Sequence, residues 1–151
     1  MQYLVDTSAL ARSLDARHPD REIATAAVER LVNRGDQLEV SPQVLYEWWA
    51  VATRPREFNG LGMTVQAASS VLATLANEFT IRFDRKSLFL AWRKLVVEYG
   101  VTGKKAHDAR LVAAMESYSL THLLTFNVQD FTRFPFIVVV SPHDVVNEPA
   151  K

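Results

Sequence analysis

Short, uninterrupted hydrophobic runs alternate along the chain with longer segments in which hydrophobic residues recur every three or four positions. The short runs are typical of strands buried on both faces, and they predict strands at 3–5, 38–40, 80–83, 122–126 and 136–140. The longer segments predict helices at about 9–14, 20–33, 42–53, 65–76, 88–98 and 105–118. Strands that alternate with helices indicate an α/β fold with a parallel sheet covered on both faces.

Capping and breaking residues mark where several of these helices begin and end. Thr7 and Ser8 offer a cap for the first helix, and Ser41 followed by proline is a typical start for the third. Thr64 offers a cap for the fourth helix. Gly35 is expected to stop the second helix, because glycine accepts the left-handed backbone that often ends helices.

Composition narrows the kind of protein. The chain has 151 residues, 48% of them hydrophobic, which predicts a single domain over 1–151 with a substantial core. Cysteine is absent, which excludes disulfides, thiolate nucleophiles and cysteine-type zinc sites. The amino-terminal residues do not read as a signal peptide, and the longest aliphatic block, 136–140, is too short to span a membrane. We therefore expect a cytoplasmic protein without a membrane partner.

Acidic and amide side chains follow the predicted strands where ligands of parallel sheets usually bind. Asp6 comes directly after the first strand, and Asn127 and Asp130 follow the strand at 122–126. Glu47 lies on a helix between hydrophobic residues, an unusual place for a charge. Asp108 lies in the first turn of its helix.

Each acid alone also has a structural explanation. Asp6 could cap a turn, Glu47 could pair in solvent with Arg54 or Arg56, and Asp108 could favour the helix dipole. Carboxylates that converge on one crevice, however, repel one another and must share a cation or a proton. An oxygen-only ligand set selects Mg²⁺ or Mn²⁺ rather than zinc, and such ions suit metal-assisted phosphoryl transfer.

Basic residues lie beside this predicted crevice, although the formal net charge of the chain is zero. Lys104, Lys105 and Arg110 flank Asp108 in sequence and could hold a polyanion; a solvated helix end is the alternative explanation. His107 is predicted to be a surface residue. The three tryptophans are predicted to be core or interface residues rather than base-stacking platforms.

The order and spacing of these residues resemble a PIN domain, and within that superfamily the chain is most similar to VapC toxins of toxin–antitoxin pairs. The resemblance covers essentially the whole chain. It rests on four motifs in order: Leu4-Val5-Asp6-Thr7-Ser8, then Val44-Leu45-Tyr46-Glu47-Trp48, then Ala106-His107-Asp108-Ala109, and finally Leu124-Thr125-Phe126-Asn127-Val128-Gln129-Asp130-Phe131.

This resemblance implies a three-layer α/β/α sandwich around a mostly parallel sheet. It also implies an Mg²⁺- or Mn²⁺-dependent ribonuclease that forms a homodimer and has a cognate antitoxin. Asp6, Glu47 and Asp108 match the metal-binding acids of the family. Many members have an aspartate where this chain has Asn127, so Asn127 and Asp130 are both candidates for the fourth position.

The resemblance also implies supporting hydroxyl groups and the reaction that the site carries out. Thr7, Ser8 and Thr125 are the expected hydroxyl helpers. The expected reaction is hydrolysis of an RNA phosphodiester, which leaves a 5′-phosphate and a 3′-hydroxyl. The alternative is a catalytically weakened PIN scaffold that binds RNA or protein, for which Asn127 is the sequence support. A haloacid-dehalogenase-like phosphatase would need an aspartate where Ser8 stands.

Overall fold

A five-stranded sheet with strand order β3-β2-β1-β4-β5 forms the centre of the protein. This is a computed structural model that describes residues 1–149, so the last two residues of the domain predicted over 1–151 lie outside the described residues. The strands are β1 (Gln2–Val5), β2 (Gln37–Val40), β3 (Thr80–Ile81), β4 (His122–Leu124) and β5 (Val138–Val140). Every neighbouring pair is parallel, as predicted.

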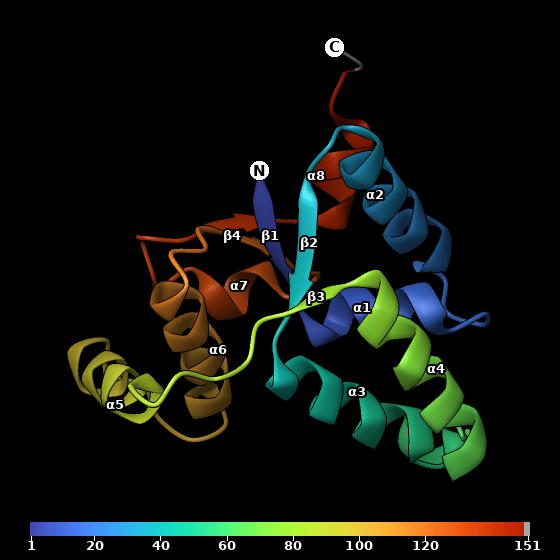
Figure 1. Ribbon diagram of the computed structural model, residues 1–151, viewed down its shortest axis with the longest axis horizontal. Coiled ribbons are helices and arrows are strands. Elements are labelled where there is room, and N and C mark those ends of the chain that lie inside the picture. Colours follow the sequence, from blue (N-terminus) through green and yellow to red (C-terminus); the bar gives the residue numbers. More distant parts are fainter. Residues whose placement is uncertain (150–151) are drawn as a thin grey trace.

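Helices cover both sides of this sheet. They are α1 (Thr7–Leu14), α2 (Arg21–Asn33), α3 (Pro42–Thr53), η1 (Arg56–Phe58), α4 (Val65–Glu78), α5 (Leu88–Glu98), α6 (Lys105–Ser117), α7 (Val128–Phe131) and α8 (Pro142–Asn147). Figure 1 shows α2 and α8 together on one side and α5 and α6 on the other. This arrangement confirms the predicted three-layer sandwich. None of the helices within residues 1–149 is long and apolar enough to cross a membrane.

β1 lies in the middle of the sheet and is its most buried strand. It pairs with β2 on one side and β4 on the other, with Leu4 opposite Glu39 and Leu123. Leu4, Val5, Leu123 and Leu124 are all at most 1% exposed. Burial on both faces explains why these strands are continuous hydrophobic runs in the sequence rather than alternating ones.

The first helix begins earlier than predicted, because its cap is a different residue. The carboxylate of Asp6 accepts a hydrogen bond from the backbone N–H of Ser8, so Asp6 is the N-cap and Thr7 is already helical. The prediction that Thr7 or Ser8 caps the helix is therefore wrong. The caps predicted at Ser41 and Thr64 are confirmed, since each side-chain oxygen accepts from a backbone N–H three residues on.

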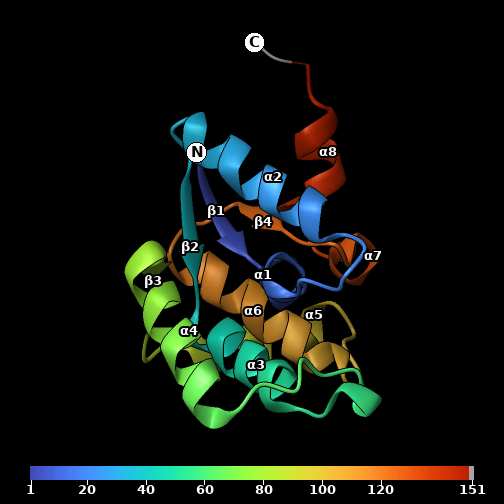
Figure 2. The same cartoon turned by 90° about the vertical axis from the view of Figure 1, so that its right-hand side faces the viewer.

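The α3–α4 pair extends away from the sheet (Figures 1 and 2). The connection between the two helices contains η1. In the loop after η1, Gly60 leaves no space for a side chain, because a Cβ atom there would lie 1.9 Å from the carbonyl oxygen of Arg54. Trp48 on α3 is fully buried, which agrees with its prediction as a core residue.

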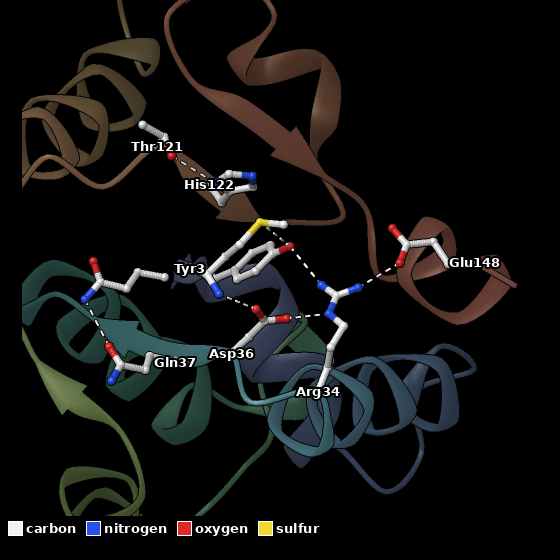
Figure 3. Close-up of polar contacts among 9 residues, drawn as sticks. Tyr3, Arg34, Asp36, Gln37, Thr121, His122 and Glu148 are labelled. Atoms are coloured by element: carbon white, nitrogen blue, oxygen red, sulfur yellow. Dashed lines mark hydrogen bonds and ion pairs between the residues drawn. The ribbon is translucent and has the colours of Figure 1, made fainter. Parts of the chain in front are cut away.

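The amino-terminal edge of the sheet is closed by a hydrogen-bonded polar cluster (Figure 3). The guanidinium of Arg34, just after α2, donates to the Tyr3 hydroxyl at 3.1 Å, to Asp36 at 2.6 Å and to Glu148 at 2.8 Å. These contacts join β1 to the ends of α2 and α8. The acids at this edge are therefore neutralised by arginine, in contrast to those at the opposite edge.

Candidate carboxylate site

Asp6 lies at the carboxyl end of β1, where the central strand turns directly into α1. Its backbone N–H still donates to Leu124 at 2.9 Å, so the ladder between β1 and β4 fixes its position. Its side chain is only 7% exposed, and Oδ2 accepts hydrogen bonds from Ser8 Oγ and Thr125 Oγ1, each at 2.7 Å. Burial raises the pKa of Asp6, and these two hydrogen bonds oppose that rise.

The two hydroxyl groups that hold Asp6 also hold the neighbouring backbone. Ser8 Oγ lies 3.1 Å from Thr125 Oγ1 and accepts from the N–H of Phe126 at 3.1 Å. Thr125 Oγ1 accepts from the N–H of Asn127 at 3.0 Å. The turns after β1 and β4 are therefore joined around the Asp6 carboxylate, and its orientation is fixed before any ligand binds.

Glu47 is carried by α3 and faces the same edge of the sheet. Thr7 Oγ1 donates to Glu47 Oε2 at 2.7 Å, and Gln43 Nε2 donates to Oε1 at 2.9 Å. None of the ion pairs within residues 1–149 involves Glu47. Arg54 instead donates to the carbonyl oxygen of Asn59. The alternative that Glu47 is a solvent-exposed partner of Arg54 or Arg56 is therefore wrong.

Gln43 is a site residue that the sequence analysis did not single out. It is buried, and its Nε2 donates both to Glu47 and to the carbonyl oxygen of His107, each at 2.9 Å. Its Oε1 accepts from Arg110 Nη1 at 2.9 Å. Gln43 precedes Glu47 by one helical turn, a spacing that places both on the same face and could have indicated the contact. It links α3 to α6.

Asp108 and Asp130 share a lysine at this edge. Lys105 Nζ contacts the Asp130 carboxylate and lies 3.8 Å from Asp108 Oδ2. Partial burial is the main cause that raises the pKa of Asp108 to about 6. The negative charges of Asp130, Asp6 and Glu47 raise it further, whereas Lys105 lowers it. Asp108 therefore lies close enough to the other three acids to be affected by their charges.

The other predicted polar and basic residues lie around this group. Asn127 is exposed at the start of α7, where its side chain does not cap the helix. Lys104 is exposed before α6, and His107 is exposed as predicted. Arg110 is held between Gln43 and Asp84, to which Nη2 donates at 2.6 Å.

The donor set fits a hard divalent cation. The acids supply oxygen ligands only, and bound positive charge would favour the ionised form of Asp108, whose pKa is raised by burial and by the neighbouring negative charges. Within residues 1–149, no three acidic or histidine side chains are already close enough together to form a ready-made metal site. Lys105 is the positive charge that these acids share in this structure.

Comparisons with known proteins agree with this architecture. The sequence profile of the PIN domain matches residues 3–137. No curated protein sequence matches the chain.

Solved structures with the same fold include VapBC complexes and a VapC toxin. One is VapBC2 from Rickettsia felis bound to a DNA fragment from its promoter: 17% identity, a TM-score of 0.71, and coverage of 93% of this chain and 98% of that one. A second is VapBC-1 from nontypeable Haemophilus influenzae, with 17% identity, a TM-score of 0.68 and coverage of 95% and 99%. A third is Mycobacterium tuberculosis VapC20, described as a sarcin–ricin loop cleaving toxin, with 20% identity, a TM-score of 0.61 and coverage of 85% and 92%.

Proposed function

The chain belongs to the PIN domain family, and on that premise we propose that it is a metal-dependent endoribonuclease, the VapC-type toxin of a toxin–antitoxin pair. The observation that carries the proposal is the gathering of Asp6, Glu47, Asp108 and Asp130 at the carboxyl edge of the sheet, where hydrogen bonds and the shared Lys105 hold them. The fold shared with VapC20, a toxin described as cleaving the sarcin–ricin loop of RNA, supports RNA as the substrate class.

Asp6, Glu47 and Asp108 would hold Mg²⁺ or Mn²⁺, directly or through water. When bound, the cation lowers the pKa of water and stabilises the charge that develops on the phosphate. In the proposed hydrolysis, a water oxygen would form a bond to phosphorus and lose a proton, while the bond between phosphorus and the 3′-oxygen would break. That oxygen takes up a proton, so the products carry a 5′-phosphate and a 3′-hydroxyl.

The chain itself contributes fixed positions for the acids. Ser8 and Thr125 hold Asp6, while Thr7 and Gln43 hold the two oxygens of Glu47. Side chains that are already oriented lose little freedom when the cation binds, and such supporting contacts tune metal affinity. The hydroxyl residues therefore act as positioning residues.

For the fourth position we favour Asp130 over Asn127. Lys105 joins Asp130 to Asp108, and the Asp130 charge contributes to the raised pKa of Asp108. When a cation occupies the site, Lys105 is free to leave the two acids and contact an RNA phosphate. The exposed Lys104 can contact a phosphate as well. Asn127 then has the smaller role of a polar group at the rim.

We also propose an antitoxin partner, a homodimer and a cytoplasmic location. The similar structures include VapBC complexes, in which toxin and antitoxin are present together. An antitoxin that covers the carboxyl edge would satisfy the same acids with a basic side chain.

Digestion of total RNA by the purified protein tests the proposed function. We expect cleavage with Mg²⁺ or Mn²⁺, none in excess EDTA, and mapped fragments that carry 5′-phosphates. The control is Glu116→Gln, which removes an exposed acid from the same helix as Asp108 and should cut like the wild type. Cleavage that persists in EDTA would defeat the proposal.

A metal titration distinguishes the proposed nuclease from the alternative, a catalytically weakened scaffold. An active site that binds Mn²⁺ should raise the melting temperature as Mn²⁺ increases. Absence of both cleavage and stabilisation would favour the weakened scaffold.

A further inference from the structure

A cavity of about 500 Å³ lies beside the carboxylate site, between the segment after β3 and the amino ends of α5 and α6. Figure 1 shows α5 packed along α6 at this side of the molecule. Among the residues that line the cavity are a phenylalanine, a tryptophan, three cations and one acid: Phe89, Trp92, Arg85, Lys86, Arg110 and Asp84.

The aromatic wall combines one fixed ring with one exposed ring. Trp92 is half-buried, and its Nε1 donates to the carbonyl oxygen of Ala106 at 2.8 Å, which fixes the indole. Phe89 is 63% exposed, and its ring centre lies 6.0 Å from that of Trp92 with the planes 34° apart. Leaving a phenylalanine this exposed is unfavourable in water, and a flat ligand would cover it.

The cations of the cavity differ in how they are engaged. Arg110 is tied to Asp84 and Gln43. None of the ion pairs in the described part of the chain involves Arg85 or Lys86. The Arg85 guanidinium stacks on the Tyr118 ring at 4.5 Å, which leaves its N–H groups available. The rim can therefore bind an anion.

The cavity is linked to the carboxylate site by hydrogen bonds and by a shared segment of α6. Arg110 lines the cavity and donates to Gln43, which in turn donates to Glu47. His107 lines the cavity and directly precedes Asp108. An RNA strand whose phosphate lies at the acids would therefore reach the cavity with a neighbouring nucleotide.

We propose that this cavity binds an unstacked nucleobase of single-stranded RNA, with its phosphate at Arg85 and Lys86. This inference rests on the proposed function for its substrate class. Single-stranded RNA is typically held by bases that stack on aromatic side chains and by basic groups along the backbone. Trp92 packs against the core, as predicted, and in this proposal the part of its ring that faces the cavity also contacts the base.

The test is equilibrium binding of a fluorescein-labelled single-stranded RNA oligonucleotide in EDTA, followed by fluorescence anisotropy. Without divalent metal the proposed cleavage is silent, so binding is measured alone. Phe89→Ala should weaken binding about 5- to 150-fold, the range found when a stacking ring is removed. The matched control is Leu90→Ala, because Leu90 is 64% exposed on the same helix but does not line the cavity.

The outcomes separate the cavity from the nuclease. Weaker RNA binding by Phe89→Ala, with no change in Leu90→Ala, supports base binding in the cavity, whether or not the wild type cleaves RNA with metal. Equal affinity of both variants and the wild type would overturn the proposal that the cavity binds a nucleobase, and the proposed function would stand. A cavity that binds a partner protein instead would give this result. If the wild-type protein binds no RNA, the proposal that the cavity binds a nucleobase is overturned as well.

Discussion

At the scale of single residues, the acids of the site differ in how they are held. Asp6 is buried and receives hydroxyl hydrogen bonds, whereas Asp108 is partly exposed and shares Lys105 with Asp130. Glu47 depends on Thr7 and Gln43. Burial raises the pKa of both Asp6 and Asp108, so each takes up a proton more readily than a free aspartate.

Removal of the Gln43 side chain should weaken the site without unfolding the protein. Gln43→Ala leaves Glu47 Oε1 without its donor, and loss of such supporting contacts typically costs about 10- to 100-fold in metal affinity or activity. The Mn²⁺ concentration for half-maximal RNA cleavage should rise accordingly. Gln66→Ala, on the exposed face of α4, is the control and should behave as the wild type. An unchanged Mn²⁺ requirement in Gln43→Ala would show that Gln43 does not position Glu47.

The raised pKa of Asp108 predicts that metal-free protein loses stability as pH rises. The pKa rises from 3.8 to about 6 on folding, so between these pH values the folded state holds a proton that the unfolded chain has released. Stability must then fall as pH rises through this window. Asp108→Asn should raise the free energy of unfolding at pH 7 by about 1–2 kcal/mol, a value reduced for partial exposure. Urea unfolding in EDTA measures it, and a variant less stable than the wild type at pH 7 would contradict it.

At the scale of elements, the sequence predicted what its own local signals encode. The helix at 42–53 was predicted from Ser41 and its following proline, and the helix at 88–98 from its periodicity; both match the structure. The short α7 has no periodicity to detect, and α8 was missed although Ser141 and its following proline repeat the signal used at Ser41. The strands at 122–126 and 136–140 are shorter than predicted, because a hydrophobic run does not show where pairing stops.

The start of α3 should depend on its cap. Ser41 Oγ accepts from the N–H of Val44 at 3.4 Å, a long hydrogen bond, so Ser41→Ala should lower the free energy of unfolding by about 0.5–1 kcal/mol. Urea unfolding at neutral pH measures the change. Ser41→Gly should be milder, since glycine is tolerated at caps. Equal stability of the alanine variant and the wild type would show that this hydrogen bond does not cap α3.

At the scale of the whole molecule, the two edges of the sheet have opposite electrostatics. Arg34 neutralises the acids at the amino edge, whereas the carboxyl edge gathers acids that repel one another. The sequence predicted this gathering for the three aspartates of the site, each of which follows a strand or begins a helix, whereas Glu47 lies within α3. It could not predict Lys105 between two acids or the Gln43 link, because both depend on how α3, α6 and α7 approach one another.

With a formal net charge of zero, RNA binding should depend only weakly on salt. Each phosphate contact to single-stranded nucleic acid contributes about −0.7 to the slope of log K against log salt. In EDTA, where Lys105 stays with its two acids, phosphate contacts at Arg85, Lys86 and Lys104 predict a slope of about −2. Lys86→Gln should make it shallower by about 0.7, while Lys94→Gln, outside the cavity on α5, should not. A slope steeper than about −4 would indicate a different, more extensive surface.

The central claim is that Asp108 belongs to a metal-dependent RNA-cleaving site. The most direct test is the rate of RNA cleavage in Mn²⁺ by the wild type and Asp108→Asn, each shown by circular dichroism to be folded. We expect the variant to lose cleavage almost completely while keeping its fold. Cleavage by folded Asp108→Asn at the wild-type rate would contradict it.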